Sequence, residues 1–168
     1  MNIWSIIDII VKGIVGGAFK LFKKEYNKSV HEGVMQFVKF GIVGVSNTFV
    51  SYLLYAVALL GLQKAGLFPK IDYLLATVFA FVLSVLWSFY WNNKYVFKIK
   101  KGQSRSFWKA LFKTYVSYSF TGLFLNSILM VLWVQLLGIS EFIAPIINLL
   151  VSVPLNFLIN KFWAFRAK

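Results

Sequence analysis

Asparagine and lysine stand side by side at two separate places in the sequence. Asn92 and Asn93 precede Lys94 at the end of a long apolar run, and Asn160 precedes Lys161 in a similar setting near the C-terminus. Amide groups donate hydrogen bonds to phosphate and to sugar hydroxyls, and an ammonium group supplies the opposite charge. These two clusters are therefore candidates for binding a phosphate-bearing ligand.

Further candidates are amides inside apolar runs and cations beside them. The amides are Asn47, Asn126, Asn148 and Asn156, and the cations are Lys98, Lys113 and Arg166. A second interpretation stays open for each kind. The amides, Asn126 and Asn148 above all, can form hydrogen bonds between helices. The cations can extend to lipid headgroups, and the neighbouring aromatic side chains can form an interfacial belt.

The residue types that carry enzyme chemistry are scarce. The sequence has no cysteine, a single histidine (His31) and five acidic residues, and all five lie in the N-terminal tail, the linkers or the outer turns, with Asp72 at the very start of the second predicted span. We find no glycine-rich phosphate loop, no metal-ligand spacing and no catalytic triad. We therefore expect a protein that is not an enzyme and holds no cofactor. A proton-driven exporter is also disfavoured, because it generally needs an ionisable residue inside the bilayer.

The two clusters belong to a longer internal repeat. At a constant offset of 68 residues, Asn92 aligns with Asn160, Phe89 with Phe157, Phe97 with Phe165, and Lys98 with Arg166. Internal similarity at a fixed spacing indicates duplicated units. We expect two similar halves, each ending where a membrane helix leaves the bilayer.

Composition indicates an integral membrane protein. Of the 168 residues, 60% are hydrophobic, against roughly 45–50% in soluble chains. Uncharged apolar runs predict four membrane helices at 37–60, 71–91, 111–137 and 142–162. Short turns join the first to the second and the third to the fourth. The predicted fold is all-α, with the four transmembrane helices arranged as two tandem hairpins.

Residues 1–32 differ from the rest and form a separate region before the membrane domain at 33–168. Isoleucines recur at helical spacing in residues 1–24, interrupted by Asp8 and several lysines. We expect an amphipathic helix in the headgroup region, followed by a polar linker at 25–32. A flexible tail is the alternative. A fifth span is disfavoured, because Asp8 and Lys12 would cost roughly 2.5–3.5 kcal/mol each in hydrocarbon.

The distribution of charge fixes the expected orientation. Of 18 Lys and Arg residues, only Lys64 and Lys70 lie in the two short turns. The positive-inside rule then places both termini and the central connector in the cytoplasm. The net charge of +13 is thus a topology signal, and nucleic-acid binding is not expected.

Three phrases carry a resemblance to a known family. They are FVKFGIVGVSNTFVSYLLY at 37–55, SFYWNNKYVFK at 88–98 and NFLINKFWAFR at 156–166. Together they resemble the GtrA family of small four-span bacterial membrane proteins. The family often has an acid shortly after the asparagine of the first span, where this sequence has Ser51.

The resemblance implies help in moving a polyprenyl-phosphate-linked sugar across the bacterial cytoplasmic membrane, for glycosylation of teichoic acid or another surface polysaccharide. In that hypothesis Asn92, Asn93, Lys94, Asn160 and Lys161 hold the phosphate, with Lys98, Lys113 and Arg166 behind them. Asn47, Asn126 and Asn156 would line the path of the sugar, while the prenyl chain stays among the membrane lipids. Four helices are few to enclose this path, so we expect a homo-oligomer, a dimer in the simplest case.

Two other functions remain open from the sequence. The first is a non-transporting membrane partner or anchor of a polyprenyl-phosphate glycosyltransferase. Its cue is the basic cytoplasmic face together with the small-residue surface at Gly41 and Gly44, which allows close helix approach. The second is a small-cation exporter, which lacks the buried acid that such proteins use.

Overall fold

Every regular element in the described part of the chain is a helix. The computed structural model describes residues 3–23, 25–140 and 143–167. Within these residues, the helices long and apolar enough to cross a membrane are Lys28–Lys64, Asp72–Val96, Phe107–Leu136 and Ile146–Ala164. The predicted all-α architecture with four transmembrane helices is therefore confirmed, and the protein is a multi-pass membrane protein.

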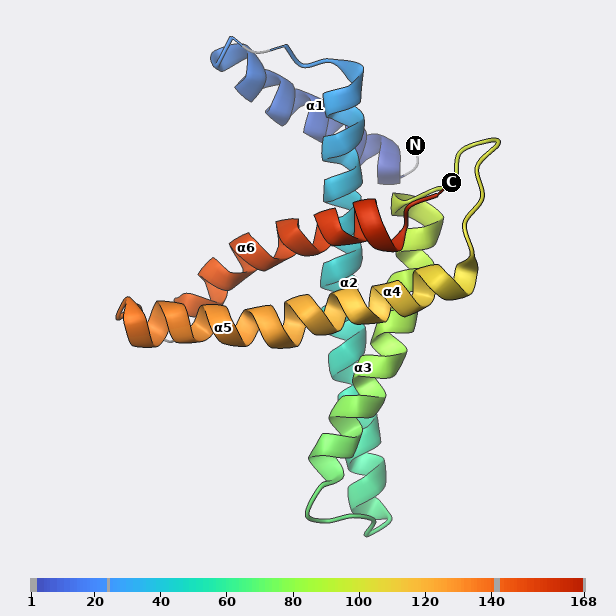
Figure 1. The fold of residues 1–168 in the computed structure, drawn as a ribbon, viewed down its shortest axis with the longest axis vertical. Helices are drawn as coiled ribbons and strands as arrows, with labels where there is room; N and C mark the ends of the chain where they lie inside the picture. The colour runs from blue at the N-terminus through green and yellow to red at the C-terminus, as the bar shows by residue number, and fades with distance from the viewer. Residues whose placement is uncertain (1–2, 24, 141–142, 168) are drawn as a thin grey trace.

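The first hairpin pairs α2 (Lys28–Lys64) with α3 (Asp72–Trp91). The two helices run antiparallel and side by side (Figure 1). The α3 helix continues without a break into a π-helical segment, η1 (Asn92–Val96). The indole nitrogen of Trp87 donates to the Ser46 hydroxyl at 2.9 Å across the pair. This hydrogen bond joins the two spans in the last part of α3, close to Asn92.

The α2 helix begins nearer the N-terminus than the sequence suggested. The side chain of Asn27 caps it by accepting a hydrogen bond from the backbone nitrogen of Val30 at 3.0 Å. The expected polar linker at 25–32 is therefore wrong, because most of it is the first turn of the helix. With 37 residues, α2 is about 55 Å long, against about 30 Å of hydrocarbon. Its polar first turns project beyond the bilayer.

The second hairpin pairs the helical segment from Phe107 to Leu136 with the segment from Ala144 to Ala164. Two amides join its helices: the Asn148 side chain donates to Oδ1 of Asn126 at 2.7 Å and accepts from the indole of Trp133 at 2.7 Å. These contacts agree with the interpretation in which Asn126 and Asn148 form hydrogen bonds between helices. The elements are α4 (Phe107–Ser119), η2 (Phe120–Leu125), α5 (Asn126–Met130), η3 (Val131–Leu136), α6 (Ala144–Ile159) and η4 (Asn160–Ala164).

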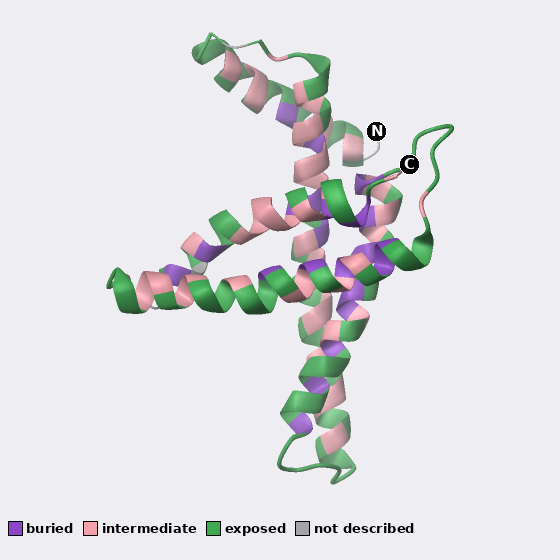
Figure 2. Ribbon diagram, viewed as in Figure 1, coloured by how far each residue is buried: buried purple, intermediate pink, exposed green. Residues whose placement is uncertain are grey.

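The second hairpin crosses the first partway along α2, beside the C-terminal end of α3, and then points away from it (Figure 1). The residues buried within the chain concentrate around this crossing (Figure 2). There, the repeated phenylalanines form an aromatic core: the rings of Phe40 and Phe97 pack against Phe157, with centroids 5.5 and 5.9 Å away. Farther along both hairpins the large apolar side chains are exposed, as expected of surfaces that face lipid.

The N-terminal helix α1 (Ile3–Leu21) packs on the projecting start of α2. Its contacts are polar and aromatic: Asp8 pairs with His31 at 2.6 Å, and the ring of Trp4 lies 5.4 Å from that of Tyr95. An apolar face of isoleucines remains exposed on the other side. The helix that the sequence predicted is present, and the alternative of a flexible tail is not what the structure shows.

Candidate functional site

The repeated asparagines begin the same local structure in both halves. Each starts a π-helical turn: the backbone nitrogen of Phe97 donates to the carbonyl of Asn92 at 2.8 Å, and that of Phe165 donates to the carbonyl of Asn160 at 2.8 Å. The Phe97 and Phe165 rings then stack with centroids 4.6 Å apart. The internal repeat is therefore structural, and both helix ends lie at one place.

The side chains of Asn92 and Asn160 point inward and are used within the protein. Asn92 donates to the Ser88 hydroxyl at 3.1 Å. Asn160 donates to the Ser117 hydroxyl and to the backbone and side-chain oxygens of Asn156, at 2.8–3.0 Å. Both are 0% exposed. Direct contact of these two amides with phosphate stays a prediction: their NH2 groups bond within the protein, and the Oδ1 atom of each is buried without a hydrogen-bond partner.

Two adjacent residues of α4, Ser117 and Tyr118, form hydrogen bonds to different halves of the chain. The Ser117 hydroxyl donates to Oδ1 of Asn156 at 2.9 Å, while the Tyr118 hydroxyl lies 2.6 Å from that of Ser88. One turn of α4 thus joins a polar group from each repeat. Because unpaired polar groups in a membrane interior are costly, this network holds the hairpins in one arrangement.

Arg105 links the two helix ends and was not singled out from the sequence. Its guanidinium donates to the carbonyl of Phe165 at 2.5 Å and to the carbonyl of Phe97 at 3.0 Å, and it also bonds to Oδ1 of Asn93. Burial lowers the pKa of this guanidinium. Asn93 is thereby committed to Arg105. The available signal was that Arg105 is the one arginine among the lysines of the central connector, since only arginine offers several donors in a fixed fork.

The predicted lysines lie at the crossing, on aromatic rings. The Lys94 ammonium is 5.4–5.5 Å from the ring centroids of Tyr90, Trp91 and Tyr95. Lys113 donates to the carbonyl of Trp163 at 3.2 Å. These cations keep their charge at the membrane edge while their stems cover apolar surface.

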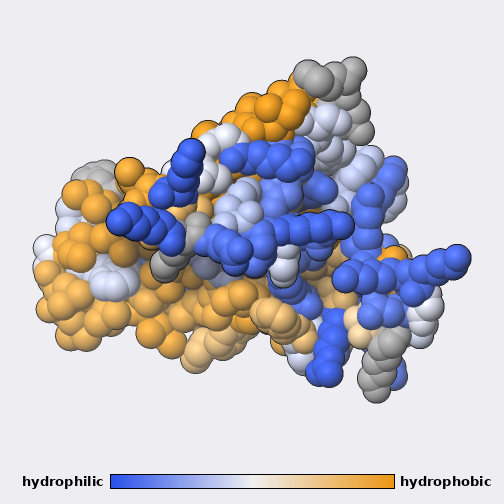
Figure 3. Space-filling model, turned by 90° about the horizontal axis from the view of Figure 1, so that it is seen from above, coloured by the Kyte–Doolittle hydropathy of each residue, from blue (hydrophilic) through white to orange (hydrophobic). Residues whose placement is uncertain are grey.

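Among these cations, Lys161 lies next to an aromatic pair at the end of the crevice. Its ammonium lies 5.4 Å from the ring centroid of Phe157, which packs on Phe40 at the end of the crevice described below. Lys98 and Arg166 are exposed. Viewed from the end that carries the termini, hydrophilic side chains cover the centre and one side of the molecule (Figure 3). We call this surface the basic end.

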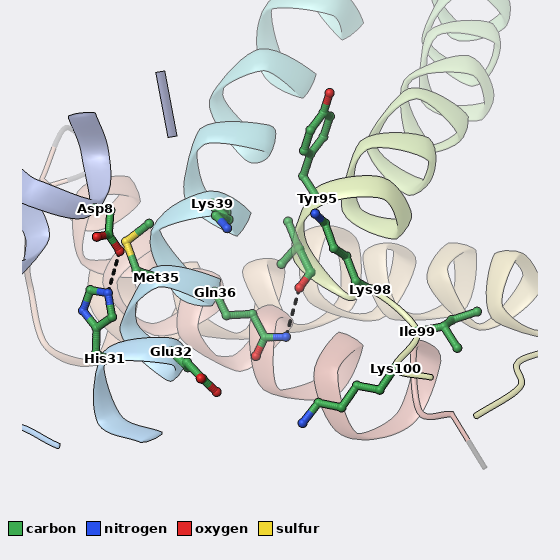
Figure 4. Close-up of a pocket in the computed structure, with 11 residues that line it drawn as sticks. Asp8, His31, Glu32, Met35, Gln36, Lys39, Tyr95, Lys98, Ile99 and Lys100 are labelled. Atoms are coloured by element: carbon green, nitrogen blue, oxygen red, sulfur yellow. Dashed lines mark hydrogen bonds and ion pairs between the residues drawn. The ribbon is translucent and has the colours of Figure 1, made fainter. Parts of the chain in front are cut away.

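A groove of about 380 Å³ opens at the basic end between α1, the start of α2 and residues 95–100. Lys39, Lys98 and Lys100 line it (Figure 4). The side chain of Gln36 donates to the carbonyl of Val96 at 3.0 Å across its floor. Asp8 and Glu32 also line the groove, so its charge is mixed.

A larger crevice of about 560 Å³ lies between α2 and the second hairpin. Its walls combine glycines and apolar side chains with hydroxyls and amides, and none of its lining residues is charged. Asn47 and Asn156 line it from different hairpins, whereas Asn126 is not part of it. The Oδ1 atom of Asn47 is buried and has no hydrogen-bond partner. The polar lining residues are Asn47, Thr48, Tyr118, Thr121, Ser152 and Asn156.

A family model described as the GtrA/DPMS transmembrane domain matches residues 39–165. The chain belongs to this family. The match begins at Lys39 and leaves out α1, so the groove of Figure 4 combines family and non-family segments.

The GtrA/DPMS chain is also similar to three curated proteins. It is 31% identical over 147 residues to the dolichol-phosphate mannosyltransferase of Pyrococcus furiosus, covering 85% of this chain and 38% of that protein. It is 30% identical over 104 residues to the cell wall teichoic acid glycosylation protein GtcA of Listeria monocytogenes, covering 58% of this chain and 66% of the relative. GtcA of Listeria innocua is 31% identical over the same length. No solved structure matches the chain.

The residues that line the crevice of this GtrA/DPMS chain are uncharged. Among the described residues, no group of three or more His, Cys, Asp or Glu side chains could hold a metal ion. Asp72 begins α3, at the end away from the basic end, and accepts a hydrogen bond from the backbone nitrogen of Tyr73 at 2.8 Å. Cations gather at one end and neutral hydrogen-bonding groups line the interior.

Proposed function

We propose that the protein moves a polyprenyl-phosphate-linked monosaccharide across the bacterial cytoplasmic membrane, for glycosylation of teichoic acid or another surface polysaccharide. The observation that carries this proposal is the neutral crevice between the hairpins, close to a cation at the basic end. The names of the relatives support the substrate class: one concerns dolichol phosphate and sugar, and two concern teichoic acid glycosylation.

Each part of the ligand has a matching surface. The phosphate would bind at Lys161, with Lys94, Lys98, Lys113 and Arg166 contributing to the positive field. The sugar would enter the crevice and exchange hydrogen bonds with Asn47 and Asn156. The prenyl chain would remain in lipid beside the diverging hairpins. The basic end would face the cytoplasm, as the positive-inside rule requires.

A second copy would complete the path. The crevice has walls from α2 and from the second hairpin only, and the hairpins diverge beyond it (Figure 1). A homodimer would close the open side and shield the sugar from hydrocarbon. No bond is made or broken in this scheme, so the protein has no catalytic residue in it.

Reconstitution tests the proposal directly. Purified protein is placed in liposomes that carry a labelled polyprenyl-phosphate hexose in one leaflet, and arrival of label in the other leaflet is followed. We expect arrival above protein-free liposomes and a loss in Asn156→Leu, which removes an amide from the crevice. Asn126→Leu is the matched control, because this amide lies outside the crevice. Equal movement with and without protein would reject transport.

The alternative is a non-transporting partner of a polyprenyl-phosphate glycosyltransferase. One observation favours it: the similar region accounts for 38% of the Pyrococcus mannosyltransferase, so in that protein it shares a chain with other sequence. In the same liposomes, label that moves only after a glycosyltransferase is added supports this reading. Movement by the purified protein alone supports transport.

A further inference from the structure

A second neutral groove lies on the first hairpin, farther from the basic end than the crevice. Its volume is about 450 Å³, within the range of about 300–1,000 Å³ for small-ligand sites. Asn47 and Thr48 line both the crevice and this groove, so the two adjoin at these residues of α2. We call it the outer groove, and its polar lining residues are Asn47, Thr48, Ser51, Tyr52, Tyr55 and Thr77.

The polar groups of the outer groove form a ladder on one face of α2. Asn47, Ser51 and Tyr55 are spaced by four residues, which places them on the same side of a helix. At a rise of about 1.5 Å per residue they lie about 12, 18 and 24 Å along the axis from Lys39. Since the hydrocarbon core is about 30 Å thick, the ladder extends from the inner half of the bilayer well into the outer half.

Most of the ladder's hydrogen-bonding capacity is unused. Ser51, Tyr52 and Tyr55 make no side-chain hydrogen bond within the described residues, and Oδ1 of Asn47 is buried without a partner. The hydroxyls of Thr48 and Thr77 donate to carbonyls of their own helices and keep their acceptor sites. Lipid hydrocarbon has no hydrogen-bond donors or acceptors, so leaving these polar groups unpaired there costs free energy. A sugar, with several hydroxyls that both donate and accept, satisfies them.

We propose that the outer groove is a second sugar-binding site, which receives the headgroup from the crevice at Asn47 and Thr48. This inference rests on the proposed transport function and adds the substrate class. No residue of either lining is charged, and a charged sugar would be buried without a partner. The phosphate already carries one charge past these linings, and a charged sugar would add a second cost of the same kind. The two linings therefore fit a neutral sugar best.

The first experiment removes hydroxyls and keeps the shape of the groove. The double variant Ser51→Ala/Tyr55→Phe is compared with Ser127→Ala/Tyr73→Phe, which makes the same chemical changes outside both sites. The probe is a labelled polyprenyl-phosphate hexose in liposomes. We expect at least a tenfold slower arrival in the far leaflet for the groove variant, with its equilibrium binding of the probe within twofold of wild type. Wild-type arrival rates in the groove variant would overturn the outer site.

The outcomes separate this inference from the function on which it rests. If Asn156→Leu slows transport and the groove variant does not, the outer site fails and the transport proposal stands. If wild-type protein moves no lipid, transport itself fails. A groove variant that changes the oligomeric mass in detergent, relative to its control, shows a second copy in the groove and overturns the site.

A second experiment tests the charge of the sugar. Polyprenyl phosphates carrying a neutral hexose or the corresponding uronic acid are compared in the same liposomes, with an identical prenyl chain. We expect the neutral compound to cross at least tenfold faster. Equal rates would show that a carboxylate passes the neutral lining, and would overturn the substrate class.

Discussion

The rings of Phe97 and Phe165 stack with centroids 4.6 Å apart, although 68 residues separate them in the chain. They occupy equivalent positions in the two halves, each one residue beyond the π-helical turn that an asparagine begins. The contact brings both membrane exits together at the basic end. The cations that follow each turn therefore act on one region of the membrane surface.

Arg105 should be essential for holding the two exits together. Arg105→Ala removes charged hydrogen bonds to two backbone carbonyls and to Asn93, and we expect a loss of roughly 2–3 kcal/mol in unfolding free energy. Arg105→Lys should restore little, because one ammonium cannot reproduce the fork. Unfolding of the purified protein in detergent measures this. Lys101→Ala, on the same connector, is the control, and equal stability of both variants would contradict the clamp.

Asn160 should matter more for stability than Asn92. Asn160 donates to oxygens of Ser117 and Asn156, whereas Asn92 donates to Ser88 alone. We expect Asn160→Ala to cost about 1–3 kcal/mol and Asn92→Ala less, since each leaves buried partners unsatisfied. In cells, surface glycosylation and protein level should then fall together. Normal levels of folded Asn160→Ala protein without glycosylation would instead indicate a direct role in binding.

Lys161 should bind phosphate without supporting the fold. Lys161→Gln is expected to weaken binding of the polyprenyl-phosphate hexose about tenfold, which corresponds to about 1.4 kcal/mol. Lys161→Arg should retain binding, because it keeps the charge. Binding is measured by titration in detergent at two salt concentrations, and the wild-type affinity should fall as salt rises. Lys64→Gln, at the last residue of α2 and far from the basic end, is the matched control.

Docking of α1 should weaken in acid. Hydrogen bonds from Lys12 and then His31 hold the pKa of Asp8 below its usual value. The bond to Lys12 lies within α1 and persists without docking, so only the lowering due to His31 stabilises the docked state. That contribution is present above the pKa of undocked Asp8 and is lost as pH falls through the docked value. The groups facing Asp8 are Lys12 on its own helix and His31 on α2, which also contacts Tyr26.

Spin labels can follow this docking, because the chain has no native cysteine. Ile9→Cys on α1 and Lys101→Cys in the connector give one distance across the groove. We expect a single short distance from neutral pH down to about pH 5 and a broader, longer distribution below about pH 4. Asp8→Asn should be broad at all these pH values. A narrow distribution in that variant would show that Asp8 does not hold α1.

The spans were predictable because hydrocarbon imposes a strong compositional demand. The repeat of Asn92 and Asn160 likewise located the paired helix ends correctly. Sequence did not reveal that these amides point inward, because exposure depends on how the hairpins cross. It also missed the early start of α2: five of the nine residues 28–36 are polar, and their helix is supported by Asn27 and by contacts with α1 that are distant in the chain.

Asn126 shows the limit of inferring a site from residue type. It is an amide in an apolar span, as Asn47 and Asn156 are, yet it bonds to Asn148 within the second hairpin. Only the crossing of the hairpins decides which amides share a crevice. The outer groove was missed for a related reason, because hydroxyls in spans are common and only their alignment with Asn47 on α2 distinguishes these.

Arg105 donates hydrogen bonds to the main-chain carbonyl oxygens of Phe97 and Phe165. A main-chain oxygen is present at both positions whichever side chain the residue carries. A duplicated ancestral hairpin held in this way can diverge over most of its length without losing its twofold organisation. The halves would then be free to specialise: one carries the hydroxyl ladder, the other the amide pair of Asn126 and Asn148. Repeated helix ends and different polar groups in the two hairpins are thus compatible in one short polypeptide.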